Sequence, residues 1–118
     1  MVARPEQEIH RAVVTHLKIR GARGLVFWHT PSGGFRRKAE AGIFKAMGAR
    51  SGVSDLILVH CSKIFCLELK APGGRVSEPQ LAFIGEMEAA GAFCCVAEGL
   101  DRAIAVLEAW GLLLGKVA

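Results

Sequence analysis

The amino-acid sequence predicts an α/β domain in which α-helices flank a mixed β-sheet. Three observations favour this fold class. Apolar residues recur at helical spacing over residues 5–20. Two apolar runs, residues 55–60 and 63–70, are separated by only two residues, as the strands of a β-hairpin are. A helical pattern, an apolar run and a second helical pattern then follow, so the expected element order is α-β-(α)-β-β-α-β-α.

The first part of the chain contains the clearest amphipathic pattern. Pro5 is suited to a first helical turn, and Ile9, Val13 and Leu17 lie on one helical face. We therefore expect a helix over residues 5–20.

Glycine and proline divide the segment that follows. Residues 25–29 predict a strand, and residues 30–34 predict a loop because they contain one proline and two glycines. Residues 38–47 predict a short helix, and Gly48 and Gly52 bracket the turn after it.

The hairpin brings charged residues together. If its turn consists of Cys61 and Ser62, counting outward along both strands places Asp55 opposite Glu68. Directly opposite side chains share a face, with Cβ atoms about 5 Å apart. Lys70 lies on the same face, because side chains alternate along a strand. Carboxylates at the ends of apolar strands are costly unless they are paired or bind a cation, and hard oxygen ligands suit Mg²⁺ or Mn²⁺.

This interpretation depends on the turn. An asymmetric turn would shift the register by one residue and separate Asp55 from Glu68. The alternative interpretation of Glu68 and Lys70 is an ordinary surface salt bridge at a strand end.

The last part of the chain alternates between helix and strand. Ser77 is suited to an N-cap with Gln80 as its capping-box partner, so we expect a helix over residues 78–90. Residues 92–97 predict a strand, and residues 100–110 predict a final helix.

Composition limits the classes of protein to consider. The 118 residues are 52% hydrophobic, which suits one domain over residues 1–118 with its own core. The net charge of +4 at pH 7 fits an anionic partner such as nucleic acid. No apolar run approaches the roughly 20 residues of a membrane helix, and residues 1–8 lack the apolar centre of a signal peptide. We expect a cytoplasmic, intracellular protein that makes no membrane contact.

Other notable side chains have structural interpretations. We expect the four cysteines to be reduced thiols in or near the core, with the adjacent Cys94 and Cys95 on opposite faces of a strand. We also expect four aromatic residues in the core. The apolar segment 110–114 is either part of the core or a subunit contact. The residues concerned are Cys61, Cys66, Cys94, Cys95, Phe27, Trp28, Phe65 and Phe83.

Several motifs together resemble one nuclease family. Asp55 followed by Glu68-Leu69-Lys70 is similar to a D…E-x-K metal centre. Residues 29–36 (HTPSGGFR) and 48–55 (GARSGVSD) are similar to the H-x-P-x-G-G-x-R and G-x-x-x-G-x-x-D segments of that family, and Gln80 stands at its helix glutamine. The family is the VRR-NUC (virus-type replication-repair nuclease) domain of the PD-(D/E)XK nuclease superfamily. Ser54 replaces its usual proline and Ser32 its common asparagine, and neither change removes a group that the mechanism needs.

The resemblance implies a restriction-endonuclease-like fold and a specific set of site residues. In the family an acid of the first helix completes the metal site. Glu6 and Glu8 are the candidates here, and we choose Glu6 because it shares the helical face of the apolar residues. The implied catalytic residues are Glu6, Asp55, Glu68, Lys70 and Gln80, and the implied metal ligands are Glu6, Asp55, Glu68 and the carbonyl of Leu69. The expected DNA-binding residues are His29, Ser32, Gly33, Gly34, Arg36, Arg37 and Lys38.

The function that follows is a Mg²⁺- or Mn²⁺-dependent DNA endonuclease acting on phosphodiester bonds. The sequence contains no helix-turn-helix or zinc-finger motif, so we expect selection by DNA structure, as in a Holliday-junction resolvase acting on branched or four-way-junction DNA. We also expect a homodimer, because the domain is small and its C-terminal segment is apolar, and we expect a bacterial or phage source and a role in DNA repair or recombination. Two alternatives remain open: a non-catalytic nucleic-acid-binding module on the same fold, and a purely structural α/β domain.

Overall fold

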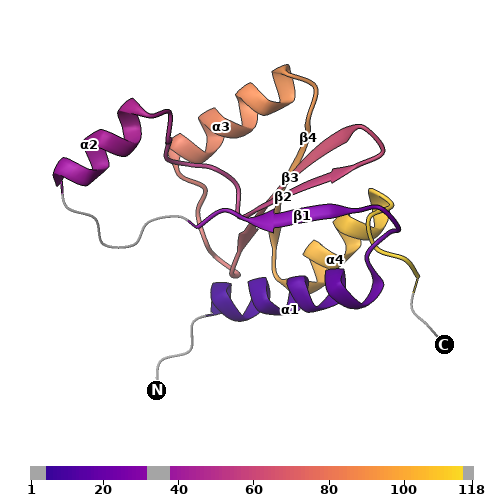
Figure 1. The fold of residues 1–118 in the computed structure, drawn as a ribbon. Helices are drawn as coiled ribbons and strands as arrows, with labels where there is room; N and C mark the ends of the chain where they lie inside the picture. Colours follow the sequence, from indigo (N-terminus) through magenta and orange to yellow (C-terminus); the bar gives the residue numbers. More distant parts are fainter. Residues whose placement is uncertain (1–4, 32–37, 116–118) are drawn as a thin grey trace.

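The computed structural model describes residues 5–31 and 38–115 of the chain. Its elements follow the predicted order, and their ends lie within a residue or two of the expected positions (Figure 1). In chain order they are α1 (Pro5–Arg20), β1 (Val26–His29), α2 (Lys38–Ala46), β2 (Leu56–His60), β3 (Lys63–Lys70), α3 (Glu78–Ala89), β4 (Phe93–Glu98) and α4 (Leu100–Ala109).

The four strands form one mixed sheet with the order β1-β2-β3-β4. β1 pairs with β2 and β2 pairs with β3 in antiparallel orientation, whereas β3 and β4 are parallel because α3 connects them. The expected α/β class with a mixed sheet flanked by helices is therefore confirmed.

The hairpin between β2 and β3 has the predicted register. Ile57 pairs with Cys66, and Leu56 pairs with Leu67 at the end of the ladder. The turn residues Cys61 and Ser62 have φ values of 50° and 65°. Two consecutive positive φ values are typical of a two-residue type I′ turn, whose twist matches that of the strands and keeps the hairpin symmetric.

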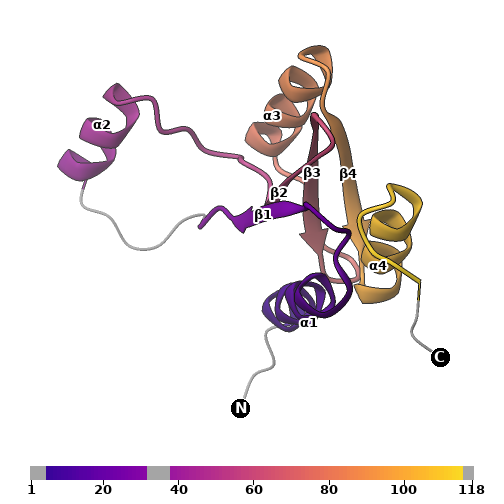
Figure 2. The same cartoon turned by 45° about the vertical axis from the view of Figure 1, so that its right-hand side comes forward.

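Helices cover both faces of the sheet (Figure 2). α1 and α4 pack on one face, where they enclose the larger apolar core, and α3 packs on the other. Strand alternation explains the division, because neighbouring residues of β3 point to opposite faces. The larger core contains Val13, Leu17, Leu56, Leu58, Phe65, Leu67, Leu69, Ala97, Ala103, Leu107, Leu112 and Leu113. The smaller core contains Ile57, Cys66 and Phe83.

Most of the expected core residues are buried, and two are not. Phe65 and Phe83 are buried, and Phe27 is partly buried against the larger core. The prediction for Trp28 was wrong: its side chain is 47% exposed, because β1 is the edge strand of the sheet. Cys61 is likewise exposed, because it occupies the hairpin turn.

The cysteines are all free thiols, as expected. Cys66 is buried between the sheet and α3. Cys94 packs toward that smaller core and Cys95 toward the larger one, so these adjacent residues do lie on opposite faces of β4.

The C-terminal apolar segment belongs mainly to the core. Leu112 is 0% exposed and Leu113 is 5% exposed, whereas Leu114 is 55% exposed. Gly21 and Leu113 form an isolated antiparallel bridge that ties the end of α1 to this segment. None of the described helices is long and apolar enough to cross a membrane.

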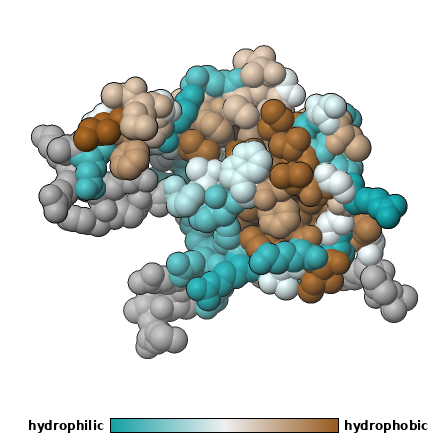
Figure 3. Space-filling model, in the orientation of Figure 1, coloured by the Kyte–Doolittle hydropathy of each residue, from teal (hydrophilic) through white to brown (hydrophobic). Residues whose placement is uncertain are grey.

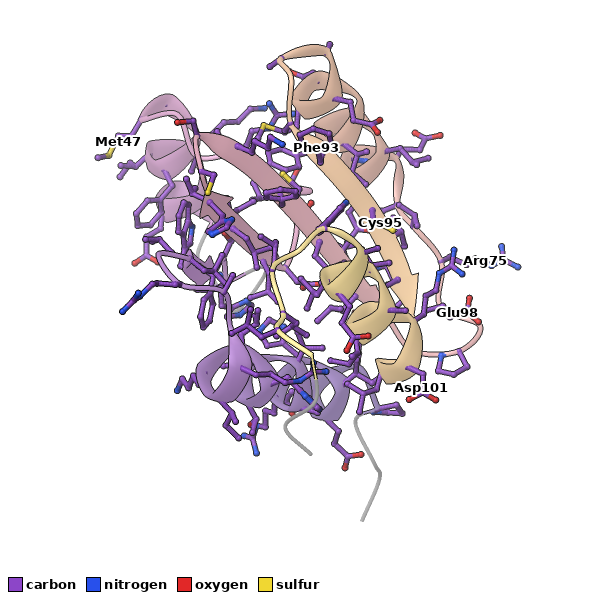
Figure 4. All side chains as sticks on the ribbon, turned by 90° about the vertical axis from the view of Figure 1, so that its right-hand side faces the viewer. Met47, Arg75, Phe93, Cys95, Glu98 and Asp101 are labelled. Atoms are coloured by element: carbon purple, nitrogen blue, oxygen red, sulfur yellow. The ribbon has the colours of Figure 1, made fainter. Side chains whose placement is uncertain are left out.

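α2 stands away from the sheet and from the other helices (Figure 1). Ile43 is 59% exposed and Met47, just after the helix, is 77% exposed. Figure 3 shows hydrophobic residues on the surface of α2, and Figure 4 shows the Met47 side chain directed away from the body of the protein. α2 therefore presents apolar side chains to the surroundings.

Candidate active site

The candidate site lies at the end of β3, where two charged residues face α3. Glu68 is 2% exposed and Lys70 is 8% exposed. The sheet face that they occupy also carries the buried Cys66. The Nζ atom of Lys70 lies 3.4 Å from Oε2 of Glu68. The two residues share a face because they are two positions apart on one strand, as the sequence predicted.

Asp55 joins this pair from the start of β2. Its Oδ2 accepts a hydrogen bond of 2.7 Å from the backbone N–H of Leu69. Its backbone carbonyl accepts hydrogen bonds from the N–H of Thr30 at 3.0 Å and from Nδ1 of His29 at 2.9 Å. Asp55 is therefore held by the strands on both sides of β2, and the hydrogen bond requires His29 to carry its proton on Nδ1.

Glu68 has the most unusual electrostatic environment of the site. Its pKa is raised from 4.5 to about 7, mainly by burial and also by the Asp55 carboxylate, while the Lys70 ammonium opposes both effects. Near neutral pH the side chain is therefore divided between its protonated and ionised forms. A cation bound between the two carboxylates would favour ionisation of both.

Gln80 connects Glu68 to the first turn of α3. Its Nε2 donates a hydrogen bond of 2.8 Å to Oε2 of Glu68. Its Oε1 accepts from the backbone N–H of Ser77 at 2.9 Å, and its own backbone N–H donates to Oγ of Ser77 at 3.3 Å. The predicted capping box is therefore present, and the same glutamine contacts the buried carboxylate.

Gly52 allows the loop before Asp55 to approach α3 closely. Its φ is +83°, and a Cβ atom at this position would overlap the backbone of Pro79 and Gln80. Only glycine satisfies both conditions. The second glycine of the G-x-x-x-G-x-x-D segment therefore brings the Asp55 loop and the Gln80 helix turn into contact.

A recess of about 560 Å³ opens beside Asp55, between the start of α1 and the end of β1. Figure 3 shows a hydrophilic, hollowed surface in this region. Glu6 lines the recess together with Asp55, and Glu8 does not. The lining residues are Pro5, Glu6, Gln7, His10, Arg11, His29, Asp55, Leu69 and Ala71.

His10 is a site residue that the sequence analysis missed. Its ring contacts the ring of His29 edge to face, with centroids 4.3 Å apart. Burial lowers the pKa of His10, the neighbouring His29 lowers it further, and Asp55 has a smaller opposing effect. The helical projection that selected Glu6 contains the signal, because His10 is four residues further on and lies on the same face.

The donor set fits a hard divalent cation with few protein ligands. Among the described residues, no group of three or more His, Cys, Asp or Glu side chains is arranged to bind a metal ion. Asp55 and Glu68 nevertheless form a close carboxylate pair whose mutual repulsion a cation would relieve. Mg²⁺ is commonly bound by one or two carboxylates, with waters and substrate phosphates completing the shell. The roles of Glu6 and of the Leu69 carbonyl as ligands stay predictions.

The expected DNA-binding residues are only partly within the described structure. Ser32, Gly33, Gly34, Arg36 and Arg37 lie outside the described residues, and Lys38 begins α2. His29 is exposed at the end of β1, and its contact with DNA stays a prediction.

Two basic residues near this segment have structural partners instead. Arg50 forms an ion pair of 2.8 Å with Glu86 of α3, and Arg20 is 8% exposed and forms one of 2.9 Å with Glu108 of α4. Neither is a free surface cation.

Fold and site together define an α/β protein of nuclease type, with a carboxylate pair and a lysine at the open end of a hairpin. The family model of the VRR-NUC domain matches residues 4–101, and the chain belongs to this family. The resemblance in the motifs is thereby confirmed.

Two solved structures are similar to this chain. A "VRR_NUC domain protein" has a TM-score of 0.76 at 24% identity, covering 93% of this chain and 90% of that chain. A "VRR_NUC domain" has a TM-score of 0.63 at 18% identity, covering 90% of this chain and 97% of that chain. At these identities the similarity shows the fold. A comparison with curated proteins gives no match.

Proposed function

We propose that this protein is a metal-dependent DNA endonuclease that hydrolyses phosphodiester bonds in branched DNA, such as four-way junctions. The observation that carries the proposal is the buried Glu68 carboxyl group, which is in contact with Lys70 and Gln80 and is electrostatically coupled to Asp55. A structural role alone gives no reason to bury a carboxylate and an ammonium at one strand end beside a second, partly buried carboxylate, because such burial is costly. Membership of the VRR-NUC family supports a nuclease.

Asp55 and Glu68 are the residues that would hold Mg²⁺ or Mn²⁺, with Glu6 and the Leu69 carbonyl as further candidates. When bound, the metal polarises a phosphodiester oxygen and lowers the pKa of bound water. The Leu69 N–H fixes the Asp55 carboxylate, and Gln80 fixes that of Glu68, so hydrogen bonds hold both carboxylates in place before substrate arrives. Such preorganisation avoids reorganisation during the reaction.

Lys70 is our candidate for the group that acts on the attacking water. Its ammonium orients the water and offsets the negative charge that develops on the phosphorane. The water oxygen loses a proton to solvent and forms a bond to phosphorus, the bond from phosphorus to the 3′ oxygen breaks, and that oxygen takes a proton from solvent. The products are a 5′-phosphate and a 3′-hydroxyl.

Two features support a preference for DNA structure rather than sequence. The segment that carries Arg36, Arg37 and Lys38 is suited to phosphate contacts, which supply affinity without sequence information. A homodimer would provide two sites related by a twofold axis, as symmetric cleavage of a four-way junction requires. The exposed Ile43 and Met47 of the α2 region are candidates for the subunit contact. Light scattering after size-exclusion chromatography tests this, and a dimer that Ile43→Glu converts to a monomer is the expected result.

The nuclease test uses labelled four-way, flap and linear DNA with Mg²⁺, Mn²⁺ or EDTA. Asp55→Asn and Lys70→Ala should each reduce cleavage by about 10²-fold or more, and EDTA should abolish it. The matched controls are Asp101→Asn on α4 and Lys63→Ala at the other end of β3, and both should cleave like the unmodified protein.

Three outcomes decide between the candidate functions. Cleavage that persists in Asp55→Asn or Lys70→Ala protein rejects the assignment of the site. Binding of DNA that survives Asp55→Asn, with no metal-dependent cleavage by the unmodified protein, supports a non-catalytic binding module. Equal cleavage of linear and branched DNA rejects the structure preference and leaves the nuclease assignment intact.

A further inference from the structure

Three residues of α1 line the recess and have no role in the mechanism above. Gln7, His10 and Arg11 are spaced by three and four residues, so they are neighbours on the helix surface. All three line the recess, and His29 and Asp55 line it as well. Side chains that can donate hydrogen bonds therefore lie beside the candidate metal site.

Arg11 is the strongest of these donors. It is exposed, and its guanidinium forms no ion pair or side-chain hydrogen bond with any of the described residues. Arg20 and Arg50, by contrast, are both paired with carboxylates. A guanidinium that is free in this way, in a recess, is suited to an anionic ligand, and its planar fork matches a phosphate.

The other charges of the recess limit which anion can bind. Glu6 and Asp55 contribute carboxylates to the same lining, so the recess repels a phosphate when no cation is present. A divalent cation at the Asp55 site would remove this repulsion. Phosphate binding at Arg11 should therefore depend on the presence of a divalent cation.

We propose that Gln7, His10 and Arg11 bind the phosphodiester backbone of one DNA strand immediately beside the bond that is cut. Arg11 contacts a phosphate, Gln7 donates a second hydrogen bond, and His10, held by its ring contact with His29, lines the recess beside them. The volume of about 560 Å³ is within the usual range for bound nucleotide-sized ligands. This inference rests on the proposed nuclease function and adds a strand-binding surface to it.

The test measures DNA binding separately from cleavage. Fluorescence anisotropy with a labelled four-way junction is recorded over a range of salt concentrations, with Ca²⁺ and with EDTA, and gels establish that the DNA stays intact. With Ca²⁺, Arg11→Ala should weaken binding about 3- to 10-fold and reduce the slope of log K against log salt by about 1. Gln7→Ala should weaken binding by a smaller factor. In EDTA the DNA affinities of the Arg11→Ala variant and of the unmodified protein should differ much less than with Ca²⁺.

Arg102→Ala is the matched control, since Arg102 is also exposed but lies on α4 and outside the recess. It removes the same charge and should leave the affinity and the salt slope unchanged. The inference is overturned if Arg11→Ala has the salt slope of the unmodified protein, or if Arg102→Ala has the same effect as Arg11→Ala. Metal-dependent cleavage with normal binding by Arg11→Ala rejects this inference alone, whereas a protein that neither binds nor cleaves DNA rejects the nuclease function as well.

Discussion

At the scale of single residues, the burial of Glu68 links protonation to stability. Its pKa is 4.5 in an unperturbed side chain and about 7 in the folded protein. The folded state therefore binds this proton more tightly than the unfolded state does. The resulting stabilisation is complete below pH 4.5 and is lost as the pH rises through about 7.

Glu68→Gln should remove this pH dependence. Without divalent metal, the variant should gain on the order of 2 kcal/mol in free energy of unfolding, relative to the unmodified protein, between pH 4.5 and pH 8. Urea denaturation at several pH values measures the difference. Glu78→Gln, an exposed glutamate of α3, is the control and should show no such trend. A constant difference between Glu68→Gln and the unmodified protein would contradict the raised pKa.

Sequence reasoning found the residues of the carboxylate pair but not all their neighbours. Asp55, Glu68 and Lys70 were predictable because strand alternation and hairpin counting are strict rules of geometry. His10 was missed, because the contact with His29 joins residues from two elements whose relative placement depends on packing. The same limitation applies to Arg20, which the sequence presents as a surface cation and the fold buries.

At the scale of elements, the hairpin turn determines the geometry of the site. Cys61 and Ser62 both have positive φ, which is unfavourable for residues with a Cβ atom. Changing them together to Asn and Gly should raise the free energy of unfolding by about 1 kcal/mol, because this pair is favoured in type I′ turns. The register stays the same, so cleavage should be unaffected.

A one-residue insertion at the same turn provides the opposite test. A glycine inserted between Cys61 and Ser62 should shift the register of β2 and β3 by one residue, which would move Glu68 away from Asp55. Cleavage should fall to background even if circular dichroism shows a folded protein. Full activity of the insertion variant would show that the register does not position the site.

Substitutions at Ser77 and Gln80 can distinguish the contribution of the start of α3 to stability from its contribution to cleavage. Ser77→Ala removes the N-cap and should cost about 1 kcal/mol of stability, with little change in the cleavage rate. Gln80→Ala removes one capping contact and also the hydrogen bond to Glu68, so it should lower both stability and the cleavage rate. Urea denaturation and single-turnover cleavage distinguish the two effects. Equal cleavage rates in the two variants would mean that Gln80 serves only as a cap.

The elements themselves were largely predictable from sequence, because the signals that determine them are local. Capping residues, apolar periodicity and paired glycines act over a few positions, so the bounds of α1, α3 and β3 could be expected closely. The exposure of Trp28 could not be expected from the sequence, because it depends on β1 being an edge strand that α3 does not cover.

At the scale of the whole molecule, Arg20 joins the end of α1 to the C-terminal part of the described chain. Its Nη1 donates hydrogen bonds to Oε2 of Glu108 at 2.9 Å and to the carbonyl of Leu114, and its own carbonyl accepts from the N–H of Leu114 at 2.8 Å. The C-terminal segment thereby covers the core with Leu112 and Leu113. No local sequence signal indicates a contact between residues so far apart.

Arg20→Met should keep the apolar volume and remove these polar contacts. We expect a loss of about 2–3 kcal/mol in free energy of unfolding, because the charged hydrogen bonds are partly buried. Glu108→Gln should cost less, since Glu108 is 39% exposed. Thermal and urea denaturation measure both. An equal loss for the two variants would mean that the ion pair, rather than the link to Leu114, stabilises the C-terminal segment.

The close approach of Gly52 to the backbone of Pro79 and Gln80 has a consequence for motion. The loop that carries Asp55 and the helix turn that carries Gln80 touch without an intervening side chain, so neither can shift without displacing the other. Fluctuations of the Asp55 loop and of the helix turn that carries Gln80 should therefore be correlated. In hydrogen exchange, the amides of residues 53–55 and of the second turn of α3 should open with similar rates, and Gly52→Ala should uncouple them.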